Sequence, residues 1–174
     1  NRTFRRLHWW CFGDACPHWK WRMRLLIDGD ACPNRKEVIE LALHYEIETF
    51  LFIDFAHDIE DERICIVRCE VGKDSVDQMI LSYIQAGDLL ISQDYGLASL
   101  ALLKEALVLH VSGKRISEDN INNLLMSRYL GHILIKQNNH VKGPKKRNQK
   151  TSHYFLRELE KIFIEYKNGI SQED

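Results

Sequence analysis

The sequence predicts an α/β protein with a single domain, in which a mostly parallel central sheet has helices on both faces and further helices at its C-terminal end. Short apolar runs alternate along the chain with stretches in which apolar residues recur at helical spacing. The runs at 25–27 and 89–91 are apolar at every position, which is typical of strands that are buried on both faces. Strands that alternate with helices through short loops favour parallel pairing.

The composition is that of a folded protein. Hydrophobic residues make up 45% of the 174 residues and charged residues 28%, so disorder of the whole chain is excluded. No apolar run approaches the roughly 20 residues that span a bilayer. No secretory signal is visible, and five cysteines without paired spacing fit a reducing compartment. We therefore expect a cytoplasmic protein that does not enter a membrane, and its oligomeric state stays open, a homodimer included.

The chain divides into three parts by composition. Residues 1–22 are basic and hold all four tryptophans, whereas the regular alternation of strand and helix patterns begins at residue 23. A basic, tryptophan-rich arm is suited to stacking on bases or to lying on a membrane surface. We instead expect 1–22 to be an extension that is disordered or not native, 23–168 to be the α/β domain, and 169–174 to be a tail.

The first half of the domain contains three expected strands and one helix. The first strand covers 23–28. Asn34, with a glutamate three residues later, resembles a capping box and opens a helix that runs to about Glu46. The β-branched and aromatic residues at 49–53 predict the second strand, and an acidic loop separates it from a third strand at 64–67.

The middle of the domain contains a helix and the fourth expected strand. The segment 72–75 is a turn and helix start, and the apolar residues of 76–84 then recur at the i, i+3, i+4, i+7 and i+8 positions of an amphipathic helix. Gly87 ends this helix, in the usual place for a C-terminal glycine. The apolar run at 89–91 is a strand that stops on three polar residues.

The rest of the domain is mainly helical. We expect a helix over 95–105, a short strand over 107–111, and a helix that starts near Ser117 and runs towards residue 135. The first turn of that helix is rich in acid, which suits the helix dipole. A basic loop follows, and the apolar residues within 155–166 form one stripe of a last helix.

Acidic side chains follow two of the buried strands. Asp28 and Asp30 end the first strand, and Asp94 ends the strand at 89–91. Because parallel strands share a direction, their carboxyl ends meet at one edge of the sheet, where ligands bind in open α/β sheets. Asp74 and Asp77 lie one turn apart at a helix start. Both can also serve simply to cap that helix, so a structural role and a functional role remain open for this pair.

Several carboxylates at one edge repel each other unless a cation lies between them. A hard divalent ion with oxygen ligands solves this, and Mg²⁺ typically takes one or two carboxylates together with waters and a substrate phosphate. We therefore predict a metal site with five candidate ligands: Asp28, Asp30, Asp74, Asp77 and Asp94.

Two further features are candidates for substrate binding. A Gly-Pro loop carries a dense group of cations that suit phosphate contacts, although such runs are often simply solvated. Ser92 and Gln93 stand beside the acid at the end of the 89–91 strand, where they can bind a phosphate or water. The candidate cations of the loop are Lys142, Lys145, Lys146 and Arg147.

Four segments of the sequence together form a recognisable pattern: 27–33 (Ile-Asp-Gly-Asp-Ala-Cys-Pro), 72–77, 86–98 and 142–144. In this pattern the chain resembles the YaiI/YqxD family of uncharacterised bacterial proteins. The family is grouped with PIN-like domains, whose better-known members are Mg²⁺- or Mn²⁺-dependent ribonucleases, although no activity is attached to the family itself. The resemblance implies a PIN-like fold.

The same resemblance implies roles for the acids. It assigns Asp28, Asp77 and Asp94 to catalysis, with Asp30 and Asp74 in support. The sequence departs from the family at Gly29, where alanine is usual and the change is expected to be mild. It departs again near Thr151 and Ser152, where the family usually has Asp-Arg, which puts in doubt any site or ion pair built on the C-terminal segment.

Three hypotheses about function remain open. The first is a metal-dependent nuclease, with RNA as its partner and Asp28, Asp77 and Asp94 at its centre. The second is a phosphatase of haloacid-dehalogenase type, because Asp28 and Asp30 imitate its nucleophile and acid; the position of Ser92 after these acids counts against it. The third is a non-catalytic module that binds RNA or a protein and keeps the acids for folding or ion binding.

Overall fold

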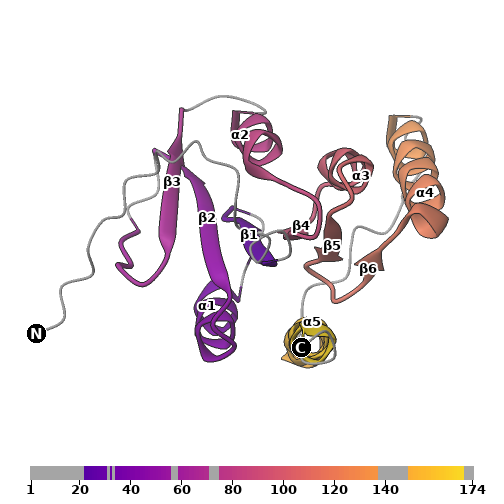
Figure 1. Cartoon of the computed structure of the whole chain (residues 1–174). Helices are drawn as coiled ribbons and strands as arrows, with labels where there is room; N and C mark the ends of the chain where they lie inside the picture. The colour runs from indigo at the N-terminus through magenta and orange to yellow at the C-terminus, as the bar shows by residue number, and fades with distance from the viewer. Residues whose placement is uncertain are drawn as a thin grey trace, which may run out of the picture.

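The computed structural model describes residues 22–30, 32, 34–55, 59–70, 75–136 and 149–170 (Figure 1). Of the predicted parts, residues 1–21 of the extension and the end of the tail lie outside the described residues. The candidate site residues Asp74, Lys142, Lys145, Lys146 and Arg147 also lie outside them.

Within the described residues, six strands form one sheet in the order β3-β2-β1-β4-β5-β6. Five of them are parallel, and only β6 runs antiparallel to its neighbour β5, which confirms the predicted mostly parallel sheet. The strands are β1 (Arg24–Asp28), β2 (Glu48–Asp54), β3 (Cys65–Cys69), β4 (Leu89–Ser92), β5 (Leu107–His110) and β6 (Arg115–Ile116).

Helices cover both faces of the sheet, as the sequence predicts (Figure 1). They are α1 (Arg35–His44), α2 (Ser75–Tyr83), α3 (Tyr95–Leu103), α4 (Glu118–Lys136) and α5 (Gln149–Ile170). α1 and α5 lie on one face, whereas α2 and α3 lie on the other, and α4 packs against α3. No helix among the described residues is long and apolar enough to cross a membrane.

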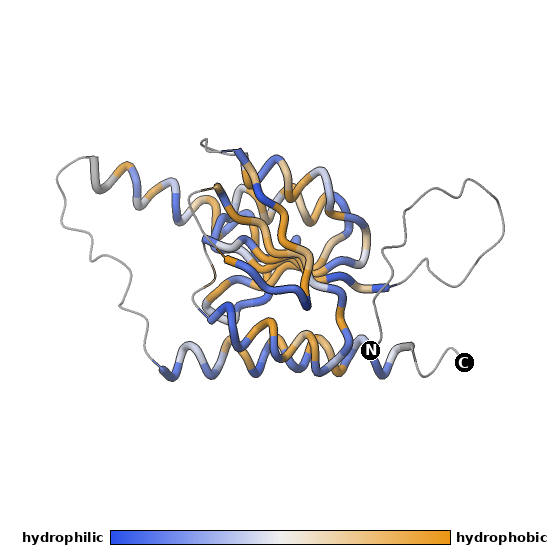
Figure 2. Tube along the Cα trace, turned by 90° about the vertical axis from the view of Figure 1, so that its left-hand side faces the viewer, coloured by the Kyte–Doolittle hydropathy of each residue, from blue (hydrophilic) through white to orange (hydrophobic). Residues whose placement is uncertain are grey.

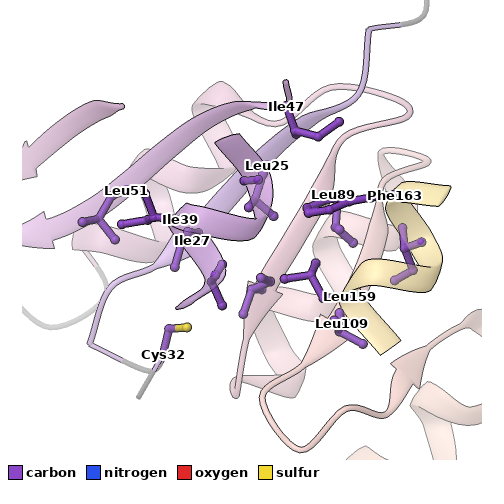
Figure 3. Packing of buried hydrophobic residues seen from close by; sticks show 14 of the residues in the cluster. Leu25, Ile27, Cys32, Ile39, Ile47, Leu51, Leu89, Leu109, Leu159 and Phe163 are labelled. Atoms are coloured by element: carbon purple, nitrogen blue, oxygen red, sulfur yellow. The ribbon is translucent and has the colours of Figure 1, made fainter. Parts of the chain in front are cut away.

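Successive residues of the central strands enter two different core layers. Leu25 and Ile27 are fully buried against α1 and α5, while Leu26 is fully buried under α2 and α3. Figure 2 shows the apolar strands gathered between the helices, and Figure 3 shows side chains of the sheet meeting Ile39 of α1 and Phe163 of α5. Each such aliphatic side chain contributes about 1.5–3 kcal/mol by leaving water. This two-sided burial explains why the strands are apolar at every position.

The structure departs from several of the predicted elements. α2 ends at Tyr83, so the predicted end of this helix at Gly87 is wrong, and Gly87 lies in the turn that follows. β6 was not predicted, since a strand of two residues leaves no periodic pattern in a sequence. The predicted capping box is wrong, because Asn34 has φ −101° and ψ 37° instead of an extended backbone, and its side chain makes no cap hydrogen bond. α3 stops at Leu103, two residues early, as Glu105 takes a left-handed conformation with φ 60°.

A buried ion pair stabilises the end of the sheet at which β1 and β4 begin. Asp88, which is 2% exposed, accepts hydrogen bonds from Nε and Nη2 of Arg24 at 3.0 and 2.5 Å, and from the backbone N–H of Gln85 at 2.8 Å. Arg24 also donates to the carbonyl oxygen of Tyr83 at 2.8 Å. The hydrogen bond to Asp88 raises the pKa of Arg24. This pair therefore joins the start of β1 to the end of α2 and the start of β4.

Removal of the carboxylate from this pair should destabilise the fold strongly. We expect Asp88→Ala to lower the free energy of unfolding by about 3–5 kcal/mol, because Arg24 and the N–H of Gln85 lose a buried partner. The matched control is Glu40→Ala, which removes an exposed partner of Arg63 and should cost less than about 1 kcal/mol. Urea unfolding followed by circular dichroism measures both, and equal losses would contradict the account.

A second test uses two glycines with opposite surroundings. Gly113 has φ +88°, and a Cβ there would lie 2.5 Å from Cδ1 of Tyr154 and 3.1 Å from Cα of Phe155 on α5. Gly113→Ala should therefore cost at least about 1–2 kcal/mol. Gly131 lies within α4 with nothing within 4 Å of a built Cβ, so Gly131→Ala should stabilise by up to about 1 kcal/mol. The midpoint of thermal unfolding should fall for Gly113→Ala and rise for Gly131→Ala. A shift of both midpoints in the same direction would refute the left-handed conformation of Gly113.

Candidate functional site

The parallel strands all end on a polar or ionisable residue. We call this side of the sheet the carboxyl edge and define it by the last residues of the five strands, which are Asp28, Asp54, Cys69, Ser92 and His110. α1, α2 and α3 each follow a parallel strand, so all three begin near this edge. The prediction that the carboxyl ends of the parallel strands meet at one edge is therefore confirmed for the described residues, and the functional role of the side chains there stays a prediction.

Three residues of the carboxyl edge form a row across neighbouring strands. Ile27 pairs with Ile91 in the register of β1 and β4, so Asp28 stands beside Ser92, and Ser92 is in register with His110 on β5. Each member of the row lies two positions after a residue buried under α2 and α3, so all three side chains face that side of the sheet. The row is Asp28, Ser92 and His110.

The Ser92 hydroxyl joins two of the predicted acids. It donates a hydrogen bond to Oδ2 of Asp28 at 2.9 Å and accepts one from the backbone N–H of Asp94 at 3.0 Å. Ser92 is 2% exposed and Asp28 is 8% exposed. The hydroxyl thus holds the end of β1 and the start of α3 together; its predicted contact with a substrate stays a prediction, as does that of the exposed Gln93.

Asp94 has a structural role that the sequence reading did not include. Its Oδ1 accepts hydrogen bonds from the backbone N–H groups of Gly96 at 2.6 Å and Leu97 at 3.0 Å, so it caps α3. Its Oδ2 lies 3.4 Å from Nη1 of Arg128 on α4. One carboxylate oxygen of Asp94 therefore fixes the helix, while the other points towards a cation.

The remaining candidate acids are spread along the same edge. Asp30 is exposed in the turn after β1, and Asp77 is partly buried in the first turn of α2. Burial, followed by the charges of Asp30 and Asp54, raises the pKa of Cys69 at the end of β3. Asp54 is in register with Cys69, and the charge of Asp30 also acts on the Cys69 thiol, so Asp30 and Asp54 lie near the ends of β2 and β3.

Asp28 and Asp94 are the two predicted metal ligands that share a hydrogen-bond partner, the Ser92 hydroxyl. Within the described ranges, no group of three or more His, Cys, Asp or Glu side chains is arranged to hold one, so the predicted five-acid cluster is not seen as a single group there. Asp74 lies outside the described residues, so its position relative to the other acids is not included. Mg²⁺ commonly takes only one or two carboxylates and fills its other positions with water or phosphate, so a divalent ion held by this pair stays a prediction.

Sequence reasoning missed three residues of this region. Asp54 and His110 each follow an apolar strand, which is the signal that identified Asp28, but the predicted strand at 107–111 placed His110 inside the strand. Arg128 left no signal, since it reaches Asp94 only because α4 packs against α3.

Gly29 allows the chain to approach β2 closely after β1 ends. Its N–H donates to the carbonyl oxygen of Phe52 at 2.8 Å, and a Cβ built on Gly29 would lie 2.5 Å from that oxygen. The alanine that is usual in the resembled family would therefore require a backbone shift here. The expectation that this departure is mild does not hold for this conformation.

The position of the row within the sheet matches a general rule for α/β proteins. β1 pairs with both β2 and β4, so the direction in which the chain adds strands reverses at β1. In open α/β sheets, ligands bind outside the carboxyl ends of the strands at this reversal. Asp28 and Ser92 lie on the two strands that flank it.

The comparisons with known proteins agree with the resemblance. The family model described as “Uncharacterized BCR, YaiI/YqxD family” matches residues 26–165. A UPF0178 protein of Natranaerobius thermophilus is 36% identical over 148 residues, which cover 84% of this chain and all of the relative. A UPF0178 protein of Alkaliphilus metalliredigens is 37% identical over 153 residues, 87% of this chain and 99% of the relative.

A third relative is similar over the same part of the chain. A UPF0178 protein of Bacillus cereus is 39% identical over 145 residues, which cover 82% of this chain and 99% of the relative. No solved structure gives a significant match. With a family model that spans most of the chain and relatives at this level of identity, the chain belongs to the YaiI/YqxD family.

Proposed function

We propose that the chain is a divalent-metal-dependent nuclease that hydrolyses phosphodiester bonds in RNA at the carboxyl edge. The observation that carries the proposal is the linked pair of Asp28 and Asp94, which stand at the reversal of strand order and are joined through the buried Ser92 hydroxyl. The resemblance to PIN-like ribonucleases supports the same reaction class.

Asp28 and Asp94 would hold Mg²⁺ or Mn²⁺, with Asp77 as the third predicted catalytic acid and Asp30 and Asp74 in support. The bound ion would supply Lewis acidity and offset the charge of the phosphate. The chain's own contribution is orientation: Ser92 fixes one oxygen of Asp28, and the first N–H groups of α3 fix one oxygen of Asp94. Held this way, the carboxylates need little reorganisation when charge develops on the phosphate.

A non-catalytic module that binds RNA or a protein is the second candidate. The N-terminal cap that Asp94 provides to α3 supports this candidate, because a structural role alone explains an acid at this position without any catalysis. The phosphatase hypothesis gains no support from the geometry. Ser92 follows the acids of this hypothesis along the chain, whereas a phosphatase of this type needs it before its metal-binding acids, and the Ser92 hydroxyl already occupies Oδ2 of Asp28.

Asp28→Asn tests the nuclease directly. The amide keeps the size of the carboxylate and an oxygen that can accept from Ser92, but it removes the charge that would bind the ion. We expect cleavage of single-stranded RNA in Mn²⁺ to fall by about a hundredfold or more, while Glu40→Gln on the exposed side of α1 leaves it unchanged.

Gel electrophoresis of an end-labelled RNA measures the cleavage. A wild-type chain that leaves RNA intact in Mn²⁺, or an Asp28→Asn variant that cleaves at the wild-type rate, would refute the nuclease. Saturable RNA binding without turnover would instead favour the non-catalytic module.

Ser92→Ala tests the link between the two acids. The buried oxygen of Asp28 loses a donor and the N–H of Asp94 loses an acceptor, so the free energy of unfolding should fall by about 1–3 kcal/mol. Ser99→Ala removes an exposed hydroxyl from the same helix region and should cost about 0.5 kcal/mol or less.

A double-mutant cycle with Asp28→Asn shows whether the two residues act as one unit. Because the amide has no buried charge to leave without a donor, Ser92→Ala should cost less in the Asp28→Asn background than in the wild type. Urea unfolding measures all four members of the cycle, and additive effects would contradict the link.

A further inference from the structure

We propose that a cavity at the amino end of the parallel strands is a docking site for the N-terminal extension of the same chain, residues 1–22, and that it takes the indole ring of Trp21. The docking is independent of the proposed nuclease, because the cavity lies where the strands begin, whereas Asp28 lies where β1 ends. The occupant is the basic, tryptophan-rich part of the sequence.

The cavity lies where β4 and β5 begin, with the C-terminal part of α5 as one wall, and has a volume of about 550 Å³. Its lining is largely apolar: Ile116 and Ile162 are buried, and Leu107 is 48% exposed. Two glycines leave its walls open, since a Cβ built on Gly87 or Gly169 would meet nothing within 4 Å. An apolar cavity of about 150 Å³ already takes a benzene ring, so an indole ring fits here.

The extension enters the described structure at this cavity. Arg22 and Met23 belong to the lining, and consecutive Cα atoms are about 3.8 Å apart, so Trp21 is within reach of the cavity by covalent geometry alone. Met23 and Leu25 belong to the core layer that packs against α5. Side chains alternate between the two faces of an extended strand. An extended backbone before β1 would therefore direct Trp21 and Trp19 to the same layer.

The charges of the extension and of the cavity are complementary. Glu105 and Glu165 line the cavity, and Arg115, which pairs with Glu165 at 2.8 Å, offsets only one of these two charges. Residues 1–22 hold five Lys and Arg against one Asp, although the net charge of the whole chain is −1, so the rest of the chain is acidic. The carboxylates also offer acceptors for the indole N–H, which usually has a partner when the ring is buried.

Covalent attachment makes the extension a favourable occupant. A tethered segment docks in an intramolecular step, at an effective concentration that no separate partner reaches at ordinary protein concentration. An aromatic side chain buries about 150–250 Å², and the exposed part of Leu107 would be covered at the same time. The alternative is the disordered extension that the sequence analysis expects, in which the tryptophans stay in water.

Tryptophan fluorescence of the full chain tests the docking, because all four tryptophans lie in residues 1–22. We expect an emission maximum at a shorter wavelength than that of N-acetyltryptophanamide, since an indole that leaves water emits at higher energy. Trp21→Phe should move the maximum to longer wavelength, whereas the matched control Trp10→Phe should leave the shift in place. The maximum should not depend on protein concentration, because the occupant belongs to the same molecule.

Leu107→Arg tests the cavity itself. The side chain is already 48% exposed, so the fold should tolerate an arginine, while its charge and bulk exclude the basic extension and move the emission to that of an exposed indole. Leu103→Arg, at a 79% exposed position of α3 outside the lining, is the matched control and should leave the emission unchanged. In the wild type, nuclear Overhauser effects between the indole protons of Trp21 and the methyl groups of Leu107 or Val108 should report the contact directly.

Three results would overturn the docking. Emission of a fully exposed indole in the wild type, or absence of these Overhauser effects, would support the disordered extension instead. A shifted maximum that Leu107→Arg does not change would mean that the tryptophans are buried elsewhere. A maximum that returns to the exposed value on dilution would identify a second copy of the chain, and not the same molecule, as the source of the occupant.

Discussion

The hydrogen bond from the Ser92 hydroxyl to the Asp28 carboxylate is the contact on which the carboxyl edge depends. Both residues are buried, and a buried carboxylate that lacks a donor is costly. Because the same hydroxyl accepts the N–H of Asp94, one side chain ties the ends of β1 and β4 to the start of α3. The two acids that would hold a metal are thus positioned by folding itself.

Charged residues have different arrangements at the two ends of the parallel strands. Where β1 and β4 begin, Arg24 and Asp88 neutralise each other in a closed pair that joins three elements. At the carboxyl edge, the Ser92 hydroxyl links Asp28 at the end of β1 to Asp94 at the start of α3, and Arg128 of α4 contacts Asp94. The first arrangement is a closed ion pair, whereas the second places two carboxylates at the reversal of strand order, where we propose that a metal ion binds.

The parts of the fold that were predictable from the sequence are those with strong local patterns. The strands around Leu26 and Leu90 are apolar at every position because both faces are covered, so their place and direction could be predicted. The cap at Asn34 was predicted wrongly, because spacing does not reveal the backbone angles of that residue. Arg128 was out of reach, since its contact with Asp94 depends on how α4 packs on α3. Local patterns therefore predicted which strands end at the carboxyl edge, whereas the contacts between side chains there depend on tertiary packing.

The central claim is that Asp28 and Asp94 together form a site for a divalent ion at the carboxyl edge. A crystal soaked in millimolar Mn²⁺ tests it most directly, because the anomalous scattering of manganese identifies the ion without assumptions about substrate. The account predicts an anomalous peak between the two carboxylates, with Ser92 still bonded to Asp28. Absence of such a peak, or a peak bound elsewhere on the chain, would contradict it.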